Sequence, residues 1–223
     1  MKRAIIFVNG NLSDLSQAKS IITNGDCLIA ADGGVKHVLK LGLVPQVVIG
    51  DFDSISTSLQ KKLKKLKIEW IQYPRKKDKT DFELAIDLVL DRKYSQIIIF
   101  GILGDRIDHF LANIFLLTKI QTENKLIKIK IVEGKKEIYI LNKEIIINGQ
   151  IGDELSIIPV SEKLEGVVTD GLEYQLKNKS LSFGSTKGIS NIFNKTSTKI
   201  TVAEGTALMV HKNRKINLSE DIL

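Results

Sequence analysis

Acidic residues gather in a few short windows in the first half of the chain, and most of these windows follow apolar runs. The windows are ADGG at 31–34, GDFDS at 50–54, KDKTDFE at 77–83 and GDRIDH at 104–109. Carboxylates that follow parallel strands converge on one crevice of an open α/β sheet. Like charges repel unless a cation holds them, and hard oxygen ligands suit Mg²⁺. The pattern therefore predicts a metal site that also holds an anion, which is typical of phosphoryl or nucleotidyl transfer.

The motif GDFDS stands at the end of the apolar run VVIG. In an extended chain, residues two apart point the same way, so Asp51 and Asp53 reach one ion while Phe52 points to the core. Gly50 permits a close backbone approach. For the motif taken alone, a turn with solvated acids or a helix N-cap by Ser54 remains an alternative.

The motif KDKTDFE contains a capping box, Thr80-x-x-Glu83, so it predicts the start of a helix. Asp81 then lies in the first turn, where the positive end of the helix dipole keeps a carboxylate ionised. This position suits a metal ligand as well as plain helix stabilisation. Lys77 and Lys79 face either phosphates or water, and the sequence leaves both open.

Two further motifs supply weaker signals. In GILGDRIDH at 101–109, Arg106 offers a planar fork for phosphate oxygens, and Asp108 suits a helix cap as well as a catalytic role. His109 is expected to pack or to face solvent. In ADGG, Gly33 and Gly34 clear the space above a helix N-terminus, as in a phosphate-approach turn. The chain has no Walker or dinucleotide glycine motif.

Strand-like apolar runs alternate with helical patterns up to about residue 132. The predicted strands cover 4–9, 27–31, 47–50, 68–73, 96–100 and 127–132, and the predicted helices cover 13–22, 34–41, 57–67, 80–93 and 108–120. Continuous apolar strands separated by helices predict a mostly parallel sheet with helices on both faces. We therefore expect an α/β domain over residues 1–134.

The pattern of apolar and turn-forming residues changes after about residue 135. Short β-type runs cover 137–141, 144–148, 155–160, 166–169, 174–176, 181–183, 199–203 and 207–211, with turn signals such as Asn148-Gly149 and Asp170-Gly171 between them. Such spacing predicts a smaller all-β domain over 135–223, built as an antiparallel sandwich or barrel.

The formal charge of +7 raises the possibility of a nucleic-acid partner. The only dense lysine run, LQKKLKKLK at 59–67, places Leu59, Leu63 and Leu66 at helical spacing, so its lysines form the solvated face of an amphipathic helix. We therefore expect no nucleic-acid partner. No apolar run is long enough for a membrane helix, so we expect no membrane association. The single cysteine, Cys27, favours a cytoplasmic protein.

Taken in order, ADGG, IGDFDSI, KDKTDFELA and GILGDRIDHFLAN resemble the motifs of the thiamine pyrophosphokinase family, as do GLEYQL, LSFGSTKGISN and VAEGTALMV in the second half. The resemblance spans nearly the whole chain. It implies a Rossmann-like catalytic domain that binds ATP and Mg²⁺, followed by a thiamine-binding β-sandwich. It also implies a homodimer with active sites shared between subunits, and transfer of the terminal diphosphate of ATP to thiamine with release of AMP.

The resemblance also implies roles for individual residues. Asp51, Asp53 and Asp81 match the Mg²⁺ ligands, and the catalytic set comprises Asp32, Asp78, Arg106 and Asp108. The substrate-binding set comprises Gly33, Thr80, Tyr174, Ser190 and Asn191, with Tyr174 as a stacking surface for the cationic thiamine. Asp81 and Asp108 are candidates for the group that accepts the proton. Asp105 and Ile192 depart from the family pattern, in which glycine and glutamate are usual.

Three alternatives stay open at this point. A related ATP-dependent diphosphokinase acts on another hydroxymethyl heterocycle such as a pterin, and Tyr174 with Ser190-Asn191 favours thiamine over it. The second alternative is a non-catalytic sensor of a nucleotide or a thiamine compound, and the full set of acidic residues argues against it because binding alone does not need so many. The third is an RNA-binding protein with a basic face, whose affinity for RNA falls steeply with salt.

Overall fold

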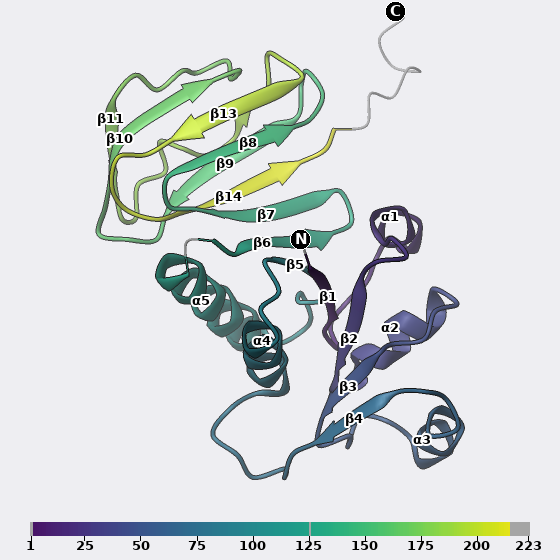
Figure 1. Cartoon of the computed structure of the whole chain (residues 1–223). Coiled ribbons are helices and arrows are strands. Elements are labelled where there is room, and N and C mark those ends of the chain that lie inside the picture. Colours follow the sequence, from purple (N-terminus) through teal and green to yellow (C-terminus); the bar gives the residue numbers. More distant parts are fainter. Residues whose placement is uncertain (1, 125, 215–223) are drawn as a thin grey trace, which may run out of the picture. The chain divides into compact units, whose positions relative to one another are not determined.

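The structure is a computed structural model that describes residues 2–124 and 126–214 (Figure 1). The chain divides into two compact units, Met1–Gly134 and Lys135–Leu223, which we call the first and the second unit. Within the described ranges, no helix is long and apolar enough to cross a membrane.

The first unit is built on a parallel sheet. In order across the sheet, its strands are β6 (Lys128–Glu133), β5 (Gln96–Phe100), β1 (Arg3–Phe7), β2 (Cys27–Ala31), β3 (Val47–Gly50) and β4 (Glu69–Gln72). Every neighbouring pair in this order is parallel, as predicted. The chain runs from β1 outward to β4 and then returns to β5 on the other side of β1. Such a reversal of strand order creates the crevice where open α/β sheets bind ligands.

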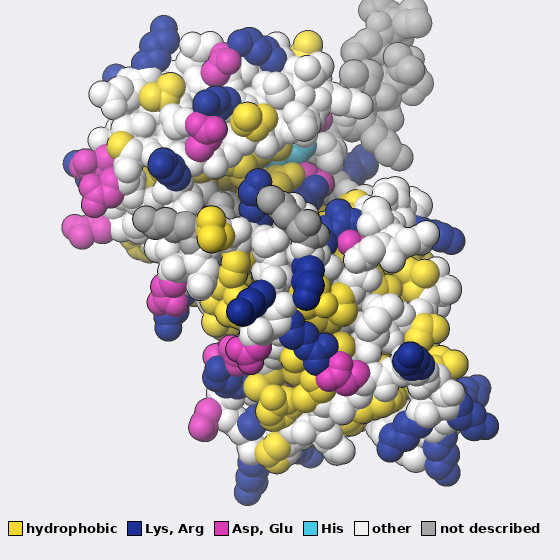
Figure 2. Space-filling view, viewed as in Figure 1, with side chains coloured by type: hydrophobic (Ala, Val, Ile, Leu, Met, Phe, Trp, Pro, Cys, Tyr) yellow, Lys and Arg dark blue, Asp and Glu magenta, His cyan; other side chains and the backbone are white. Residues whose placement is uncertain are grey.

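Helices connect these strands, close to the predicted ranges. They are α1 (Leu15–Ile21), the short 3₁₀ helix η1 (Asp32–Gly34), α2 (Val35–Lys40), α3 (Thr57–Leu63), α4 (Asp81–Asp91) and α5 (Ile107–Glu123). The prediction for α3 was too long, because the Leu66 N–H bonds to Leu63 O at 2.9 Å and the chain turns toward β4. Leu66 is therefore 43% exposed and not part of the apolar stripe. Lys and Arg side chains gather on the surface over α3, at the lower right of Figure 2.

Alternate strand residues build the core of the first unit. Ile5, Phe7, Val48 and Phe100 belong to one cluster that also holds side chains of α1, α2 and α3, among them Ala18, Val35 and Leu63. The Phe7 and Phe100 rings stack with centroids 5.4 Å apart. Burial of each such side chain contributes roughly 1.5–3 kcal/mol. Helix α4 packs against strands β2 and β3.

The second unit consists of antiparallel sheets, as predicted. One sheet has the order β12 (Asn191–Ile192), β9 (Glu154–Pro159), β14 (Ala207–Lys212) and β7 (Lys136–Leu141), and the other has β11 (Lys179–Ser182), β10 (Lys163–Asp170), β13 (Ser197–Thr201) and β8 (Glu144–Asn148). Leu155 and Met209 of the first sheet share one core cluster with Leu164 and Ile200 of the second. Side chains from both sheets are thus buried together.

One predicted strand, residues 174–176, is wrong. Its backbone bonds to side chains instead of to a neighbouring strand. Tyr174 N–H donates to Asn191 Oδ1 at 3.0 Å, and Leu176 N–H donates to Thr169 Oγ1 at 2.8 Å. Because these partners are distant in the sequence, the apolar alternation of YQL did not reveal them.

A buried polar network joins the strands of the second unit. His211 on β14 is 1% exposed, and its Nε2 lies 2.9 Å from Asp153 Oδ2 and its Nδ1 3.7 Å from Glu137 Oε2. Burial lowers the pKa of His211, but the nearby Glu137 carboxylate and the hydrogen bond and charge of Asp153 outweigh burial and leave the pKa raised. Burial raises the pKa of Asp153, but backbone N–H groups of Gln150 and Arg214 together with His211 leave it lowered.

This network predicts a pH dependence for the second unit. The stabilisation from His211 is present below its ordinary pKa of 6.5 and is lost as the pH rises through the raised folded pKa. Each unit by which the folded pKa is raised contributes about 1.4 kcal/mol. We expect amide protection of β14, measured by hydrogen exchange relative to intrinsic rates, to fall between mildly acidic and alkaline pH. H211Q should abolish this slope, whereas H109Q, a change at an exposed histidine, should keep it. Equal slopes in H211Q and the unchanged chain would contradict the assignment.

Candidate active site

A cavity of about 430 Å³ lies in the first unit at the carboxyl ends of its strands. Its wall combines the residues after β1, the end of β2, the segment before α4 and the start of α5. The residues are Val8, Asn9, Ala31, Asp32, Ser54, Arg75, Lys77, Asp78, Lys79, Thr80, Asp81, Phe82, His109 and Asn113. These segments meet because the carboxyl ends of parallel strands lie at one edge of the sheet.

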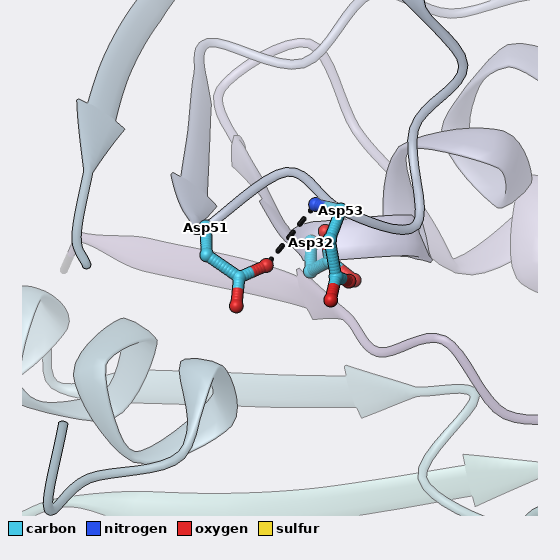
Figure 3. A group of neighbouring side chains, drawn as sticks. All are labelled: Asp32, Asp51 and Asp53. Atoms are coloured by element: carbon cyan, nitrogen blue, oxygen red, sulfur yellow. Dashed lines mark hydrogen bonds between the residues drawn. The ribbon is translucent and has the colours of Figure 1, made fainter. Parts of the chain in front are cut away.

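Three carboxylates form a compact group, of which Asp32 lines this cavity. One carboxylate oxygen from each of Asp32, Asp51 and Asp53 lies within 4.8 Å of the others. Figure 3 shows the three side chains together, Asp32 from the start of η1 and Asp51 and Asp53 from the turn after β3, with Asp51 Oδ1 accepting the Asp53 N–H at 3.1 Å. Such a group of hard oxygen donors suits Mg²⁺.

The predicted reason for the Asp51–Asp53 pairing was wrong, although the two side chains do meet. Phe52 between them has φ +65°, so the segment is a turn and not an extended strand. This turn still buries Phe52, which is 6% exposed and packs edge-on against Trp70 with ring centroids 5.0 Å apart. The helix that follows is capped by Ser56 and not by Ser54.

Asp81 lies next to this group. It begins α4, and Thr80 caps the helix by accepting the Glu83 N–H at 3.1 Å, as predicted. A Cβ atom added at Gly50 would lie 3.0 Å from Asp81 Cγ and 3.2 Å from Asp32 Cβ. Gly50 therefore lets Asp81 and Asp32 approach the backbone of β3 closely.

The pKa of Asp81 reflects this crowding. Burial raises the pKa of Asp81, and the charges of Asp51 and Asp32 raise it further against the opposing effect of Lys77. Lys77 Nζ lies 2.9 Å from Asp81 Oδ1 and 3.7 Å from Asp51 Oδ2. The carboxylates thus repel one another, and a cation at the site relieves that repulsion.

Asp32 supplies the sharpest sign of an ion site. It is 8% exposed and has φ +46°, a backbone conformation that is uncommon for a residue other than glycine. Among the described residues, no donor reaches its buried Oδ1 atom. A buried carboxylate oxygen without a donor is costly unless a cation binds it. The residues present therefore fit a divalent metal ion.

Other predicted residues divide between the cavity and the surface. Asp78 and Thr80 line the cavity, and Gly33 lies beside it, where a Cβ atom would come within 2.3 Å of Asn9 Oδ1. Arg106 and Asp108 are exposed and pair with each other at 2.5 Å, and neither is among the described residues that line the cavity. The Arg106 guanidinium holds the pKa of Asp108 well below its usual range. The helix-cap alternative for Asp108 was wrong, because α5 begins at Ile107 after Arg106.

Sequence reasoning missed two amide side chains in the cavity wall. Asn9 lies two residues after the end of β1, and Asn113 lies one helical turn after His109 on α5 and is 7% exposed. A polar residue at the end of an apolar strand was an available signal for Asn9. The position of Asn113, four residues after His109, was the available signal for the second.

Family comparisons agree with this geometry. The family model described as "Thiamin pyrophosphokinase, catalytic domain" matches residues 18–131, and the model described as "Thiamin pyrophosphokinase, vitamin B1 binding domain" matches residues 143–207. The chain belongs to the thiamin pyrophosphokinase family.

Individual relatives of the thiamin pyrophosphokinase family support this assignment. The chain is 34% identical over 184 residues to the thiamine pyrophosphokinase of Bacillus subtilis (strain 168), covering 82% of this chain and 85% of that protein. The crystal structure of thiamine pyrophosphokinase from Bacillus subtilis superposes with a TM-score of 0.86 at 28% identity, covering 96% of this chain and 100% of that one. The structure of thiamin pyrophosphokinase from Geobacillus thermodenitrificans gives 0.82 at 28% identity, with 97% and 99% covered.

These comparisons bear on the alternatives. The matched family models and the relatives described above are all thiamin pyrophosphokinases. The alternative of a diphosphokinase for another hydroxymethyl heterocycle, such as a pterin, therefore finds no support.

The remaining predicted residues lie in the range of the family's vitamin B1 binding model. Tyr174 is 68% exposed. The Asn191 amide is occupied within the chain, since its Nδ2 donates to Tyr174 O at 2.7 Å and its Oδ1 accepts the N–H groups of Tyr174 and Ile192 at 3.0 and 2.9 Å. Ser190 has φ +56°, and its N–H donates to Ser156 Oγ at 3.0 Å. Asn191 thus fixes the backbone of Tyr174.

Proposed function

We propose that this chain is an ATP-dependent diphosphotransferase that converts thiamine and ATP to thiamine diphosphate and AMP. The observation that carries the proposal is the carboxylate group of Asp32, Asp51 and Asp53 beside a cavity that also presents Arg75, Lys77 and Lys79. Diphosphoryl transfer needs positioning and charge neutralisation more than covalent chemistry by the protein. Negative ligands for a metal and positive side chains for phosphates together meet this need.

We propose Asp51, Asp53 and Asp81 as the ligands of Mg²⁺, with Asp32 and Asp78 completing the acidic cluster. When bound, Mg²⁺ supplies Lewis-acid polarisation of the phosphate oxygens and a template for in-line transfer. Gly33 leaves room beside the cavity, and Thr80 orients Asp81 by capping α4. Arg106 and Asp108 join the catalytic set only if their exposed ion pair opens toward the phosphates.

We further propose that Tyr174, Ser190 and Asn191 form the thiamine side of the site. The exposed ring of Tyr174 suits stacking on the cationic thiamine, a contact worth ~1 kcal/mol or more when desolvated. Asn191 acts here by holding the Tyr174 backbone, because its amide groups are already bonded.

The Tyr174 assignment predicts a specific kinetic change. Y174A should raise the KM for thiamine about fivefold, which corresponds to the loss of ~1 kcal/mol of cation–π attraction, and should leave kcat nearly unchanged. The steady-state rate as a function of thiamine at saturating ATP measures this. F183A, at another exposed aromatic residue of the second unit, is the control. An equal KM in Y174A and F183A would contradict a stacking role.

The proposal extends to assembly, location and fold. A homodimer with shared active sites is supported by an apolar stripe on α5, where Ile107, Leu111 and Phe115 are 70%, 45% and 57% exposed. Light scattering of the chain and of L111E tests the dimer.

A cytoplasmic location is supported by the single cysteine, and cell fractionation tests it. A Rossmann-like sheet with helices on both faces is supported by α1–α3 and α4–α5 lying on opposite sides of β1–β4 in Figure 1.

A single assay tests the function. Purified chain with ATP, Mg²⁺ and thiamine should release thiamine diphosphate and AMP in equal amounts, measured by chromatography. Release of ADP in place of AMP, or an absence of thiamine diphosphate, would overturn the proposal.

A further inference from the structure

Lys77 differs from the other positive side chains of the cavity in how deeply it is placed. Its side chain is 14% exposed, against 84% for Arg75 and 47% for Lys79. Arg75 lies 3.6 Å from Asp53, and Lys79 pairs with Glu83 and Asp87, both outside the carboxylate group. Lys77 alone among these three contacts two of the proposed metal ligands, Asp51 and Asp81.

The surroundings of Lys77 show what these contacts achieve. Its Nζ atom lies 2.9 Å from Asp81 Oδ1 and 3.7 Å from Asp51 Oδ2, within ion-pair distance of both carboxylates. The ammonium group therefore partly neutralises the crowded acids. A divalent ion that binds Asp51 and Asp81 competes with this ammonium group, because two cations held by the same carboxylates a few ångströms apart repel each other.

We propose that Lys77 is the internal counter-ion of the carboxylate group, so that a metal ion binds tightly only together with a polyphosphate. This inference rests on the metal site of the proposed function. A metal ion alone has to displace Lys77 and leave the ammonium group without its carboxylate partners. A metal ion that arrives with a triphosphate brings phosphate oxygens into the same cavity, and these provide new partners for the displaced ammonium. Lys77 thereby couples the two binding events and acts as a positioning residue.

The experiment measures Mg²⁺ binding by calorimetry, with and without a non-hydrolysable ATP analogue, and the unfolding midpoint in EDTA. K77M removes the internal charge, K77R retains it, and K76M removes an exposed lysine outside the cavity. Without nucleotide, K77M should bind Mg²⁺ ~10-fold more tightly than the unchanged chain, and its midpoint in EDTA should be lower. K77R and K76M should stay within about twofold of the unchanged chain. With the analogue, the advantage of K77M should disappear.

The outcomes separate this inference from the metal site itself. A K77M variant that binds Mg²⁺ as the unchanged chain does, or more weakly, overturns the counter-ion role and leaves the metal site standing. An advantage of K77M that persists with the analogue overturns the coupling. If neither the unchanged chain nor K76M binds Mg²⁺ under any of these conditions, the proposed metal site is wrong, and the counter-ion role of Lys77 is wrong with it.

Discussion

Replacement of Asp51 or Asp53 by asparagine is expected to abolish turnover, with kcat lowered ~10³-fold or more. Each change keeps the shape of the side chain but removes one negative charge from a group whose oxygens lie within 4.8 Å of one another. A neutral amide is a poor ligand for Mg²⁺ beside the remaining carboxylates. Chromatographic measurement of AMP release at saturating ATP, Mg²⁺ and thiamine provides the rate.

The same two variants should keep their fold and their affinity for thiamine. Removing one of several crowded like charges relieves repulsion, so the unfolding midpoint in EDTA should be equal to or higher than that of the unchanged chain. Thiamine binding, measured by calorimetry, should stay within about twofold because Tyr174 is unaltered. D87N is the matched control, since Asp87 pairs with Lys79 at 2.6 Å and is not among the described cavity residues. Normal rates in both D51N and D53N would show that the metal assignment is wrong.

The framework that brings the acids together was predictable from the sequence. The apolar runs before Asp32 and Asp51 are β2 and β3, which pair in parallel register with Ala31 opposite Ile49. Parallel neighbours end at the same edge, so residues that follow them meet. The capping box at Thr80 likewise placed Asp81 at the start of α4. The spacing of apolar residues and the capping box each lie within a short stretch of sequence, so that stretch alone is enough to predict the strand or the helix start.

The contacts that define the site chemistry were less predictable. The left-handed conformation of Phe52 makes the Asp51–Asp53 pair a turn, and a large aromatic residue gives no signal of such a backbone. The sequence left open whether Lys77 contacts phosphates or water, but in the structure its ammonium group forms ion pairs with Asp81 and Asp51. The Asn191 amide bonds to Tyr174, which is 17 residues away. These contacts depend on which segments the fold brings together, and spacing along the chain does not contain that information.

The close approach at Gly50 predicts the second large effect, a loss of activity in G50A. The added Cβ would lie 3.0 Å from Asp81 Cγ and 3.2 Å from Asp32 Cβ, at a residue whose φ is +145°. Both acids have to move by a few tenths of an ångström. Because a misplacement of about 1 Å at a catalytic group costs ~100-fold in rate, we expect kcat to fall ~10-fold and the unfolding free energy to fall by about 1–3 kcal/mol. Rates are measured well below the unfolding midpoint, and urea unfolding followed by Trp70 fluorescence gives the stability.

G42A separates backbone strain from displacement of the acids. Gly42 also has a positive φ, +74°, but a Cβ atom there would meet nothing within 4 Å. G42A should therefore lose about 1 kcal/mol of stability through strain alone and keep kcat within about twofold. If G50A were as active as G42A at matched temperature, the approach of Asp81 and Asp32 to β3 would be irrelevant to catalysis. If G50A loses activity while G42A does not, the spacing between these two carboxylates and the strand is what the reaction requires.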